Sequence, residues 1–178
     1  MRILIGYASK TGTAKACAER LGEELKHQDV TLADLDTRNP NPCEYDVVIL
    51  GSSVRFGRAR QSLRAYLQEH GAELCEKPHA LFLCCGFGHE FERYVQKIFD
   101  KSLLDSAYAA LNFGGLLKLE KAGFWEKMIL RWVRSDIRES EINDGEYTPT
   151  LPSILPENIS MMASHTKREL SRIKQNQV

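Results

Sequence analysis

The chain alternates short apolar runs with longer stretches in which apolar residues recur every three or four positions. Apolar runs of strand length predict strands at residues 2–7, 30–35, 47–51, 80–85 and 107–113. Helical periodicity predicts helices at residues 14–26, 60–70, 90–104 and 156–174. Continuous apolar runs such as the one at 47–51 are typical of strands covered on both faces. The alternation therefore predicts an α/β fold with a doubly wound, mainly parallel sheet of five strands.

One interval, at about residues 114–152, breaks this alternation. It separates the last predicted strand from the last predicted helix, and it is too long for an ordinary loop. It also carries a pattern of its own, so we interpret it as an inserted helical segment before the last helix. The chain has 178 residues, which suits one well-cored domain, and residues 1–178 are expected to form a single domain.

The centre of this insertion, residues 121–138, is predicted to be an amphipathic helix with a basic side. One face carries Trp125, Met128, Ile129, Trp132 and Val133, and another carries Lys127, Arg131, Arg134 and Arg138. Such a helix can lie in the headgroup region of an anionic bilayer, or cap a hydrophobic substrate while its cations hold carboxylates. It can also pack its tryptophan face onto the domain and leave its basic face in solvent, and the pattern alone favours that packing.

The amino-acid composition limits the partners, the location and the metal sites that are expected of the protein. Lysine and arginine together number 24, as do aspartate and glutamate, so no overall charge favours nucleic acid as a partner. The apolar run at the N-terminus is too short for a signal peptide, and no apolar stretch reaches the roughly 18 residues of a spanning helix. We therefore expect a cytoplasmic protein, with peripheral membrane contact through residues 121–138 as one possibility. The five cysteines show no CxxC pair and no zinc-like spacing with histidine, and no metal site is expected.

The turn after the first predicted strand is rich in hydroxyl groups and contains one glycine. In an open parallel sheet, ligands bind beyond the carboxyl ends of the strands, where the strand order reverses. A turn that opens a helix offers unpaired N–H groups and the positive end of the helix dipole, which suit a phosphate group. An ordinary helix cap and tight turn would explain the same residues. The candidate phosphate-binding residues are Ser9, Lys10, Thr11, Gly12, Thr13 and Ala14.

Two later loops follow the third and fourth predicted strands and should lie at the same edge. In the second loop, small residues allow a planar ring to approach the backbone, Phe56 can stack on it, and Arg55 can neutralise negative charge. A strand-ending turn with an exposed arginine is the plainer alternative. The candidate residues are Ser53, Val54, Arg55, Phe56 and Gly57 in the second loop, and Cys85, Gly86, Phe87 and Gly88 in the third. The adjacent cysteines of the third loop are interpreted as small buried residues rather than redox groups.

The sequence SKTGTA at residues 9–14 resembles the phosphate loop of the flavodoxin family, usually T/S-x-T-G-x-T, and departs from it at Ala14. The resemblance implies a flavodoxin-like fold and a mononucleotide cofactor, FMN. The sequence GSSVRFG at residues 51–57 is similar to the stretch G-[AS]-S-[IV]-R-[YF]-G of the flavodoxin-like, menaquinone-dependent protoporphyrinogen IX dehydrogenases, and the similarity continues to residue 70. That family implies non-covalent FMN, oxidation of a porphyrinogen and delivery of electrons to a membrane quinone.

These observations favour an FMN-dependent oxidoreductase of that type. Its substrate would be a porphyrinogen and its acceptor a quinone, and Arg55 would be the catalytic residue, stabilising the reduced flavin or a propionate. The second hypothesis is an electron carrier that docks redox proteins, although such carriers are usually strongly acidic and this chain is balanced. A third is a binding or regulatory domain whose cofactor loop has decayed, as Ala14 would suggest.

Overall fold

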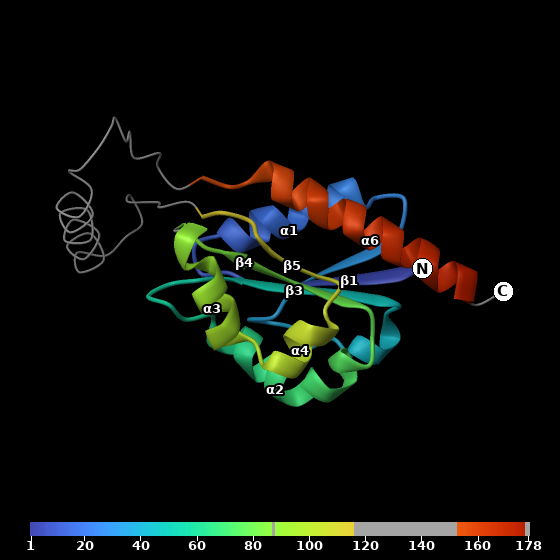
Figure 1. Ribbon diagram of the computed structural model, residues 1–178, viewed down its shortest axis with the longest axis horizontal. Coiled ribbons are helices and arrows are strands. Elements are labelled where there is room, and N and C mark those ends of the chain that lie inside the picture. The colour runs from blue at the N-terminus through green and yellow to red at the C-terminus, as the bar shows by residue number, and fades with distance from the viewer. Residues whose placement is uncertain (87, 116–152, 177–178) are drawn as a thin grey trace.

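The computed structural model describes residues 1–86, 88–115 and 153–176, which form a parallel sheet between two layers of helices (Figure 1). The strands are β1 (Arg2–Ala8), β2 (Asp29–Asp34), β3 (Val47–Ser53), β4 (His79–Cys84) and β5 (Ala109–Asn112). Their order across the sheet is β2-β1-β3-β4-β5, and every neighbouring pair is parallel. The doubly wound, flavodoxin-like α/β fold with five parallel strands, expected from the sequence, is thereby confirmed.

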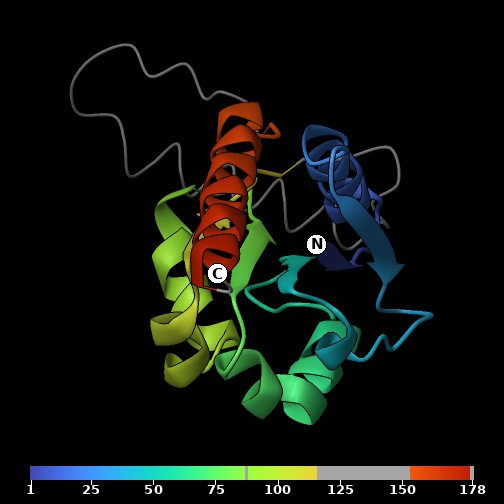
Figure 2. The same cartoon turned by 90° about the vertical axis from the view of Figure 1, so that its right-hand side faces the viewer.

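Helices cover both faces of the sheet (Figures 1 and 2). On one face lie α1 (Thr13–Glu24) and α6 (Pro156–Asn176), and on the other lie α2 (Gln61–Cys75), α3 (Phe91–Ile98) and α4 (Lys101–Ser106). The link between β2 and β3 contains the 3₁₀ turn η1 (Pro42–Glu44), and a second such turn, η2 (Gly88–Glu90), precedes α3. The loop after β1 therefore leads to a helix on one face of the sheet, and the loop after β3 leads to a helix on the other face.

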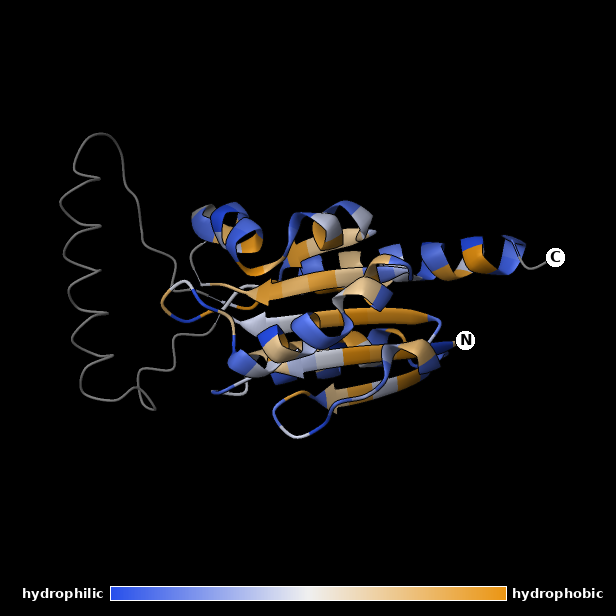
Figure 3. Cartoon of the chain, turned by 90° about the horizontal axis from the view of Figure 1, so that it is seen from below, coloured by the Kyte–Doolittle hydropathy of each residue, from blue (hydrophilic) through white to orange (hydrophobic). Residues whose placement is uncertain are grey.

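Successive residues of each strand point to opposite faces, which creates two cores. Ile3 and Ile5 of β1 pack with α1 and α6, while Leu4 between them packs on the side of α2. All seven residues of β3 are buried. Because both faces of the sheet are covered, its central strands are apolar over most of their length. Figure 3 shows this concentration of hydrophobic residues on the strands.

The helices differ from the sequence expectation by more than two residues in two places. The helix α2 continues to Cys75 instead of ending near residue 70, because the fully buried Leu74 extends its apolar side. The single helix expected at 90–104 is wrong: α3 ends before Phe99, whose backbone is extended, and α4 starts after the N-cap residue Asp100. The buried residues Val95, Phe99 and Leu103 keep a spacing of four across the break, so periodicity could not reveal it.

His79, the first residue of β4, joins the sheet to α4 and is fully buried. Its Nδ1 lies 2.9 Å from the carbonyl oxygen of Lys77, and its Nε2 lies 2.9 Å from the carbonyl oxygen of Leu103. Replacing His79 with leucine should lower the free energy of unfolding by about 2 kcal/mol, because leucine cannot replace the hydrogen bond that the imidazole ring donates to a carbonyl group. Urea denaturation followed by circular dichroism measures this change. The same replacement at the exposed His27 should change it by less than about 0.5 kcal/mol, and equal effects at the two positions would contradict the assignment.

The residues that flank the expected insertion are hydrogen-bonded to each other at the carboxyl end of β5. The N–H group of Gly115 donates to the carbonyl oxygen of Ser153 at 3.1 Å, and that of Leu155 donates to Phe113 at 2.9 Å. Residues 116–152 lie outside the described residues, and with them the helical segment and the membrane contact expected at 121–138. Among the helices that the structure describes, none combines the length and the apolar character needed to cross a membrane.

Candidate cofactor site

The loops that follow β1, β3 and β4 meet at one edge of the sheet, because these strands are neighbours and parallel. Figure 3 shows the strand arrowheads at the same end of the molecule. From β1 the chain passes through α1, on one face, to the neighbouring strand β2. From β3 it passes through α2, on the other face, to β4 in the opposite direction, so the strand order reverses between β1 and β3. This is the switch point at which open α/β sheets bind ligands, so the three loops predicted from the sequence are brought together.

The first loop, residues 9–12, ends at Gly12, which is the N-cap of α1 and has a φ of +86°. Its backbone conformation is left-handed, which glycine adopts without strain. The N-cap glycine has no side chain with which to cap the helix, and the first turn of α1 contains no acidic residue, so no carboxylate neutralises the positive end of the α1 dipole there. The hydroxyl of Ser9 instead accepts the N–H group of Ala14 at 3.1 Å, which holds the loop against the helix.

The space around this loop fits a phosphate group. A Cβ placed on Gly12 would meet no atom of the described residues within 4 Å, so there is open space beside the N-cap of α1. Thr11 is half-buried and Lys10 beside it is exposed, and a hydroxyl and an ammonium group are both hydrogen-bond donors suited to an anion. The side chain of Ala14 points elsewhere, because it is fully buried in the core beneath α1. The side chain of Ala14 is therefore not available to a ligand at this loop.

The second loop, residues 53–60, carries a tight turn at its tip. The N–H groups of Arg55 and Arg58 each donate to the other's carbonyl oxygen at 3.0 Å, and both central residues have positive φ, +49° at Phe56 and +68° at Gly57. This is the geometry of a type I′ turn, which asparagine and glycine adopt easily and phenylalanine does not. The Phe56 side chain is 65% exposed, so no burial in the described part of the chain compensates this strain. Residues with strained backbone conformations are concentrated at functional sites.

Neighbouring elements hold the second loop in place. The N–H group of Val54 donates to the carbonyl oxygen of Cys84 at 3.0 Å, which joins the loop to the end of β4. Gly57 rests on α3, since a Cβ added to it would lie 3.2 Å from the ring of Tyr94. Arg55, the expected catalytic residue, thus lies on a turn that is fixed from two sides.

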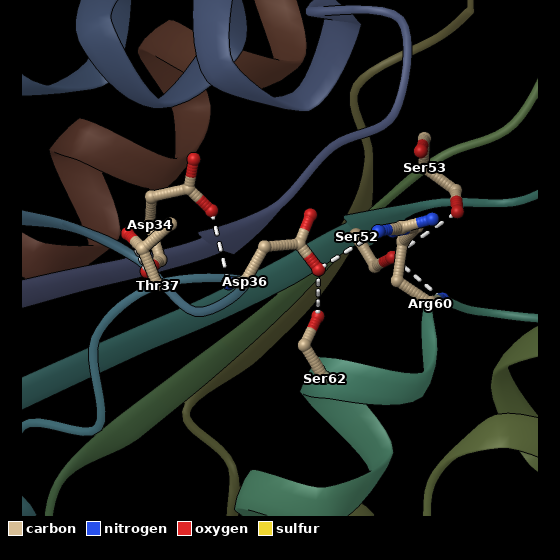
Figure 4. Close-up of polar contacts among 7 residues, drawn as sticks. All are labelled: Asp34, Asp36, Thr37, Ser52, Ser53, Arg60 and Ser62. Carbon is tan, nitrogen blue, oxygen red and sulfur yellow. Dashed lines mark hydrogen bonds and ion pairs between the residues drawn. The ribbon is translucent and has the colours of Figure 1, made fainter.

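The two serines that end β3 have different roles. Ser52 is fully buried, and its hydroxyl donates to the carbonyl oxygen of Ser53 and accepts the N–H group of Arg60, both at 3.1 Å. The hydroxyl of Ser53 is buried and has no hydrogen-bond partner among the described residues. In Figure 4 it points away from Ser52 and Arg60. A buried hydroxyl without a partner is destabilising, so it marks a position where a bound group can supply the missing hydrogen bond.

The third loop is positioned by Asn112, a residue that sequence reasoning missed. Its Oδ1 accepts the N–H group of Cys85 at 3.2 Å and that of Gly114 at 2.9 Å. The backbones of Gly86 and Gly115 approach closely, because a Cβ on Gly115 would lie 2.7 Å from the nitrogen of Gly86. The signal in the sequence that could have identified Asn112 was a polar residue at the end of an apolar strand. Of the other expected residues of this loop, Gly88 is exposed, and Phe87 lies outside the described residues.

Buried cysteine thiols lie near the candidate site. Cys84 donates to Cys17 of α1 with 3.7 Å between the sulfur atoms, and both residues and Cys85 are buried. The hydrogen bond to Cys17, together with burial, holds the pKa of Cys84 well above its ordinary value, so this thiol stays protonated and unreactive. In the described part of the chain, no cluster of three or more histidine, cysteine, aspartate or glutamate side chains is arranged to hold a metal ion.

Comparison with known proteins finds a family model, the flavodoxin domain, that matches residues 4–142. The protoporphyrinogen IX dehydrogenase (quinone) of Leishmania major is 20% identical over 143 residues, covering 74% of this chain and 62% of that protein. The protein of the same name from Escherichia coli K12 is 26% identical over 88 residues, covering 46% of this chain and 47% of its own length. The chain therefore spans less than two thirds of either relative. Among solved structures, oxidised Flavodoxin 2 from Bacillus cereus is 24% identical with a TM-score of 0.48, covering 62% of this chain and 79% of that one.

Proposed function

Since the chain belongs to the flavodoxin domain family, its cofactor is FMN, and we propose that it is an oxidoreductase that takes electrons from a porphyrinogen and passes them to a quinone. The observation that carries the proposal is the meeting of three loops at the switch point of the sheet, where the buried hydroxyl of Ser53 has no partner among the described residues. Flavodoxins are a standard example of ligand binding at this position.

The residues of the first loop would hold the phosphate group of FMN. Gly12 leaves the N-terminus of α1 open to it, and Ser9, Thr11 and Thr13 add hydroxyl groups around the loop. Lys10 is exposed and supplies a positive charge at the outer side. Because the first turn of α1 has no acidic residue, nothing in that turn competes with the phosphate for the helix dipole.

The second and third loops would hold the flavin ring. When bound, FMN supplies the two-electron redox chemistry, and the protein supplies binding, orientation and electrostatics. Phe56 offers an aromatic face, and the hydroxyl of Ser53 offers a buried hydrogen-bonding group. The cation of Arg55 would stabilise negative charge on the reduced ring or on a propionate of the substrate. Residues 85–88 would line the other side of the ring.

The assignment of a porphyrinogen and a quinone is supported by the two named relatives and by the GSSVRFG stretch, in which Arg55 lies. The alternative is an electron carrier. The exposed Phe56 at the tip of the second loop favours it, because an aromatic side chain at the edge of a cofactor site also suits docking of a redox protein.

Anaerobic stopped-flow absorbance of the FMN-loaded protein distinguishes the two functions. Mixing with protoporphyrinogen IX should bleach the flavin absorbance, and a menaquinone analogue added next should restore it. A flavin that binds but stays oxidised in the presence of the porphyrinogen would contradict the enzyme and favour the carrier. A chemical reductant serves as the control that the bound flavin can be reduced at all.

A further inference from the structure

A charged cluster ties the second loop to the turn that follows β2 (Figure 4). We call it the Asp36 brace, and it consists of Asp36, Arg60 and Ser62. Nη2 of Arg60 donates to Oδ1 of Asp36 at 2.9 Å, and the hydroxyl of Ser62 donates to the same oxygen at 2.6 Å. Hydrogen bonds to a carboxylate at these distances are among the stronger ones in proteins. The brace therefore connects two segments that are distant in the sequence.

The brace is better protected from solvent than an ordinary surface ion pair. The side chains of Arg60 and Asp36 are 34% and 25% exposed, whereas those of the Lys101–Asp105 pair in α4 are 89% and 63% exposed. Screening by water and salt is weaker at the partly buried pair. In addition, Nε of Arg60 is buried without a partner among the described residues, so the side chain depends on Asp36 as its acceptor.

Asp36 is held firmly on its own side of the contact. Its N–H group donates to Oδ1 of Asp34 at 3.0 Å, and the N–H group of Leu35 donates to the carbonyl oxygen of Tyr7 in β1 at 2.9 Å. Burial would raise the pKa of Asp36, but the hydrogen bonds from Ser62 and Arg60 outweigh it, and the pKa lies below its ordinary value. The carboxylate is therefore ionised at neutral pH and remains so in mild acid.

From Arg60 the hydrogen bonds continue into the candidate cofactor site. The N–H group of Arg60 donates to the hydroxyl of Ser52, which donates to the carbonyl oxygen of Ser53. These contacts close the base of the second loop, whose tip is the turn between Arg55 and Arg58. One end of the loop continues β3, and the other end, Arg60, is the N-cap of α2, which the brace ties in addition to the turn after β2.

The turn needs such an anchor because its own sequence does not favour its shape. Phe56 has a φ of +49°, which is unfavourable for a residue other than glycine or asparagine. A loop released at one end would leave this conformation for part of the time. Because apparent affinity falls in proportion to the fraction of molecules in the binding shape, a loosened loop binds its ligand more weakly.

We propose that Asp36 is a positioning residue for the cofactor site: through Arg60 it holds the second loop, and the strained turn at its tip, in the shape that binds FMN. The identity of the ligand rests on the proposed function. The effect of Asp36 on the loop does not, and it can be measured without any ligand.

The test compares the full chain with the variant Asp36→Asn in two measurements. The first is amide hydrogen exchange by NMR at Arg55 and Arg58, the two residues whose N–H groups close the turn. The second is the FMN dissociation constant from quenching of flavin fluorescence. We expect exchange at both amides to be about tenfold faster and FMN to bind about tenfold more weakly in the variant. If Asp36→Asn does not fold, Ser62→Ala removes the shortest hydrogen bond of the brace and should shift both readouts in the same direction.

Two further variants separate positioning from a general loss of stability. Asp105→Asn disrupts a carboxylate–ammonium pair with a 2.7 Å contact in α4, away from the loop, and should leave both readouts unchanged. In a Phe56→Asn background the turn has the Asn-Gly sequence that adopts the type I′ shape by itself. There the effect of Asp36→Asn should shrink to less than about threefold.

The outcomes are distinguishable. Unchanged amide exchange in Asp36→Asn overturns the inference, whether or not FMN binds. An undiminished effect of Asp36→Asn in the Phe56→Asn background overturns the route through the turn. If the wild-type chain does not bind FMN but the exchange results are as expected, the proposed function fails and the role of Asp36 in shaping the loop stands.

Discussion

Replacing Gly12 with valine should weaken FMN binding by about tenfold to a hundredfold, as measured by quenching of flavin fluorescence. The N-cap of α1 has a φ of +86°, and an L-residue in this region is disfavoured by about 1–2 kcal/mol, more if it is β-branched. Valine would shift the backbone of the first loop and displace the N–H groups that, in the proposed site, would face the phosphate. The space around Gly12 is not the limiting factor, because its Cβ would meet no atom within 4 Å.

Gly71 provides the matched control for this prediction. A Cβ at Gly71 also meets nothing within 4 Å, but this glycine lies inside α2 with ordinary helical geometry. Gly71→Val should leave FMN affinity unchanged, since valine and glycine have similar helix propensities within about 0.5 kcal/mol. Wild-type affinity in Gly12→Val, or equal losses in both variants, would contradict the assignment of the phosphate loop.

Replacing Phe82 with alanine should lower the free energy of unfolding by about 3–5 kcal/mol. Phe82 of β4 is 1% exposed and stacks on Phe113 with 4.5 Å between the ring centroids. Its ring also covers Gly51 of β3, where a Cβ would overlap it. Removing the ring therefore leaves a cavity in the middle of the core on the α1 side, and urea denaturation measures the loss.

Phe56→Ala is the control for the core prediction, because it removes the same side chain from a position that is 65% exposed. Its free energy of unfolding should change by less than about 0.5 kcal/mol. A Phe82→Ala variant as stable as the wild-type chain would show that the core beneath α1 does not depend on this ring pair.

The strands and the three loops could be predicted from the sequence because each depends on local patterns. A continuous apolar run such as the one at residues 47–51 reports burial on both faces directly, and the glycine and hydroxyl groups of residues 9–14 are a local sign of a helix N-terminus. Because neighbouring strands pair in parallel, the loops that follow them lie at the same edge of the sheet, and this needs no further information. The choice of FMN came from the resemblance of two short motifs rather than from periodicity.

Other features depend on tertiary contacts that no local pattern reveals. The break between α3 and α4 keeps the spacing of their buried residues, so the apolar pattern is the same with or without it. Asn112 acts on the third loop from a different strand, and Asp36 reaches Arg60 across 24 residues of sequence. The positive φ of Phe56 was also beyond prediction, because phenylalanine does not favour that conformation.

The most direct test of the account is a titration of the purified, flavin-free chain with FMN and, separately, with riboflavin, which has the same ring and no phosphate. If the loop before α1 holds a phosphate and the other two loops hold the ring, FMN should bind with one site per chain and at least about tenfold more tightly than riboflavin. Equal affinity for the two flavins would contradict the phosphate loop. Failure of both to bind would contradict the cofactor site as a whole and favour a domain whose cofactor loop has decayed.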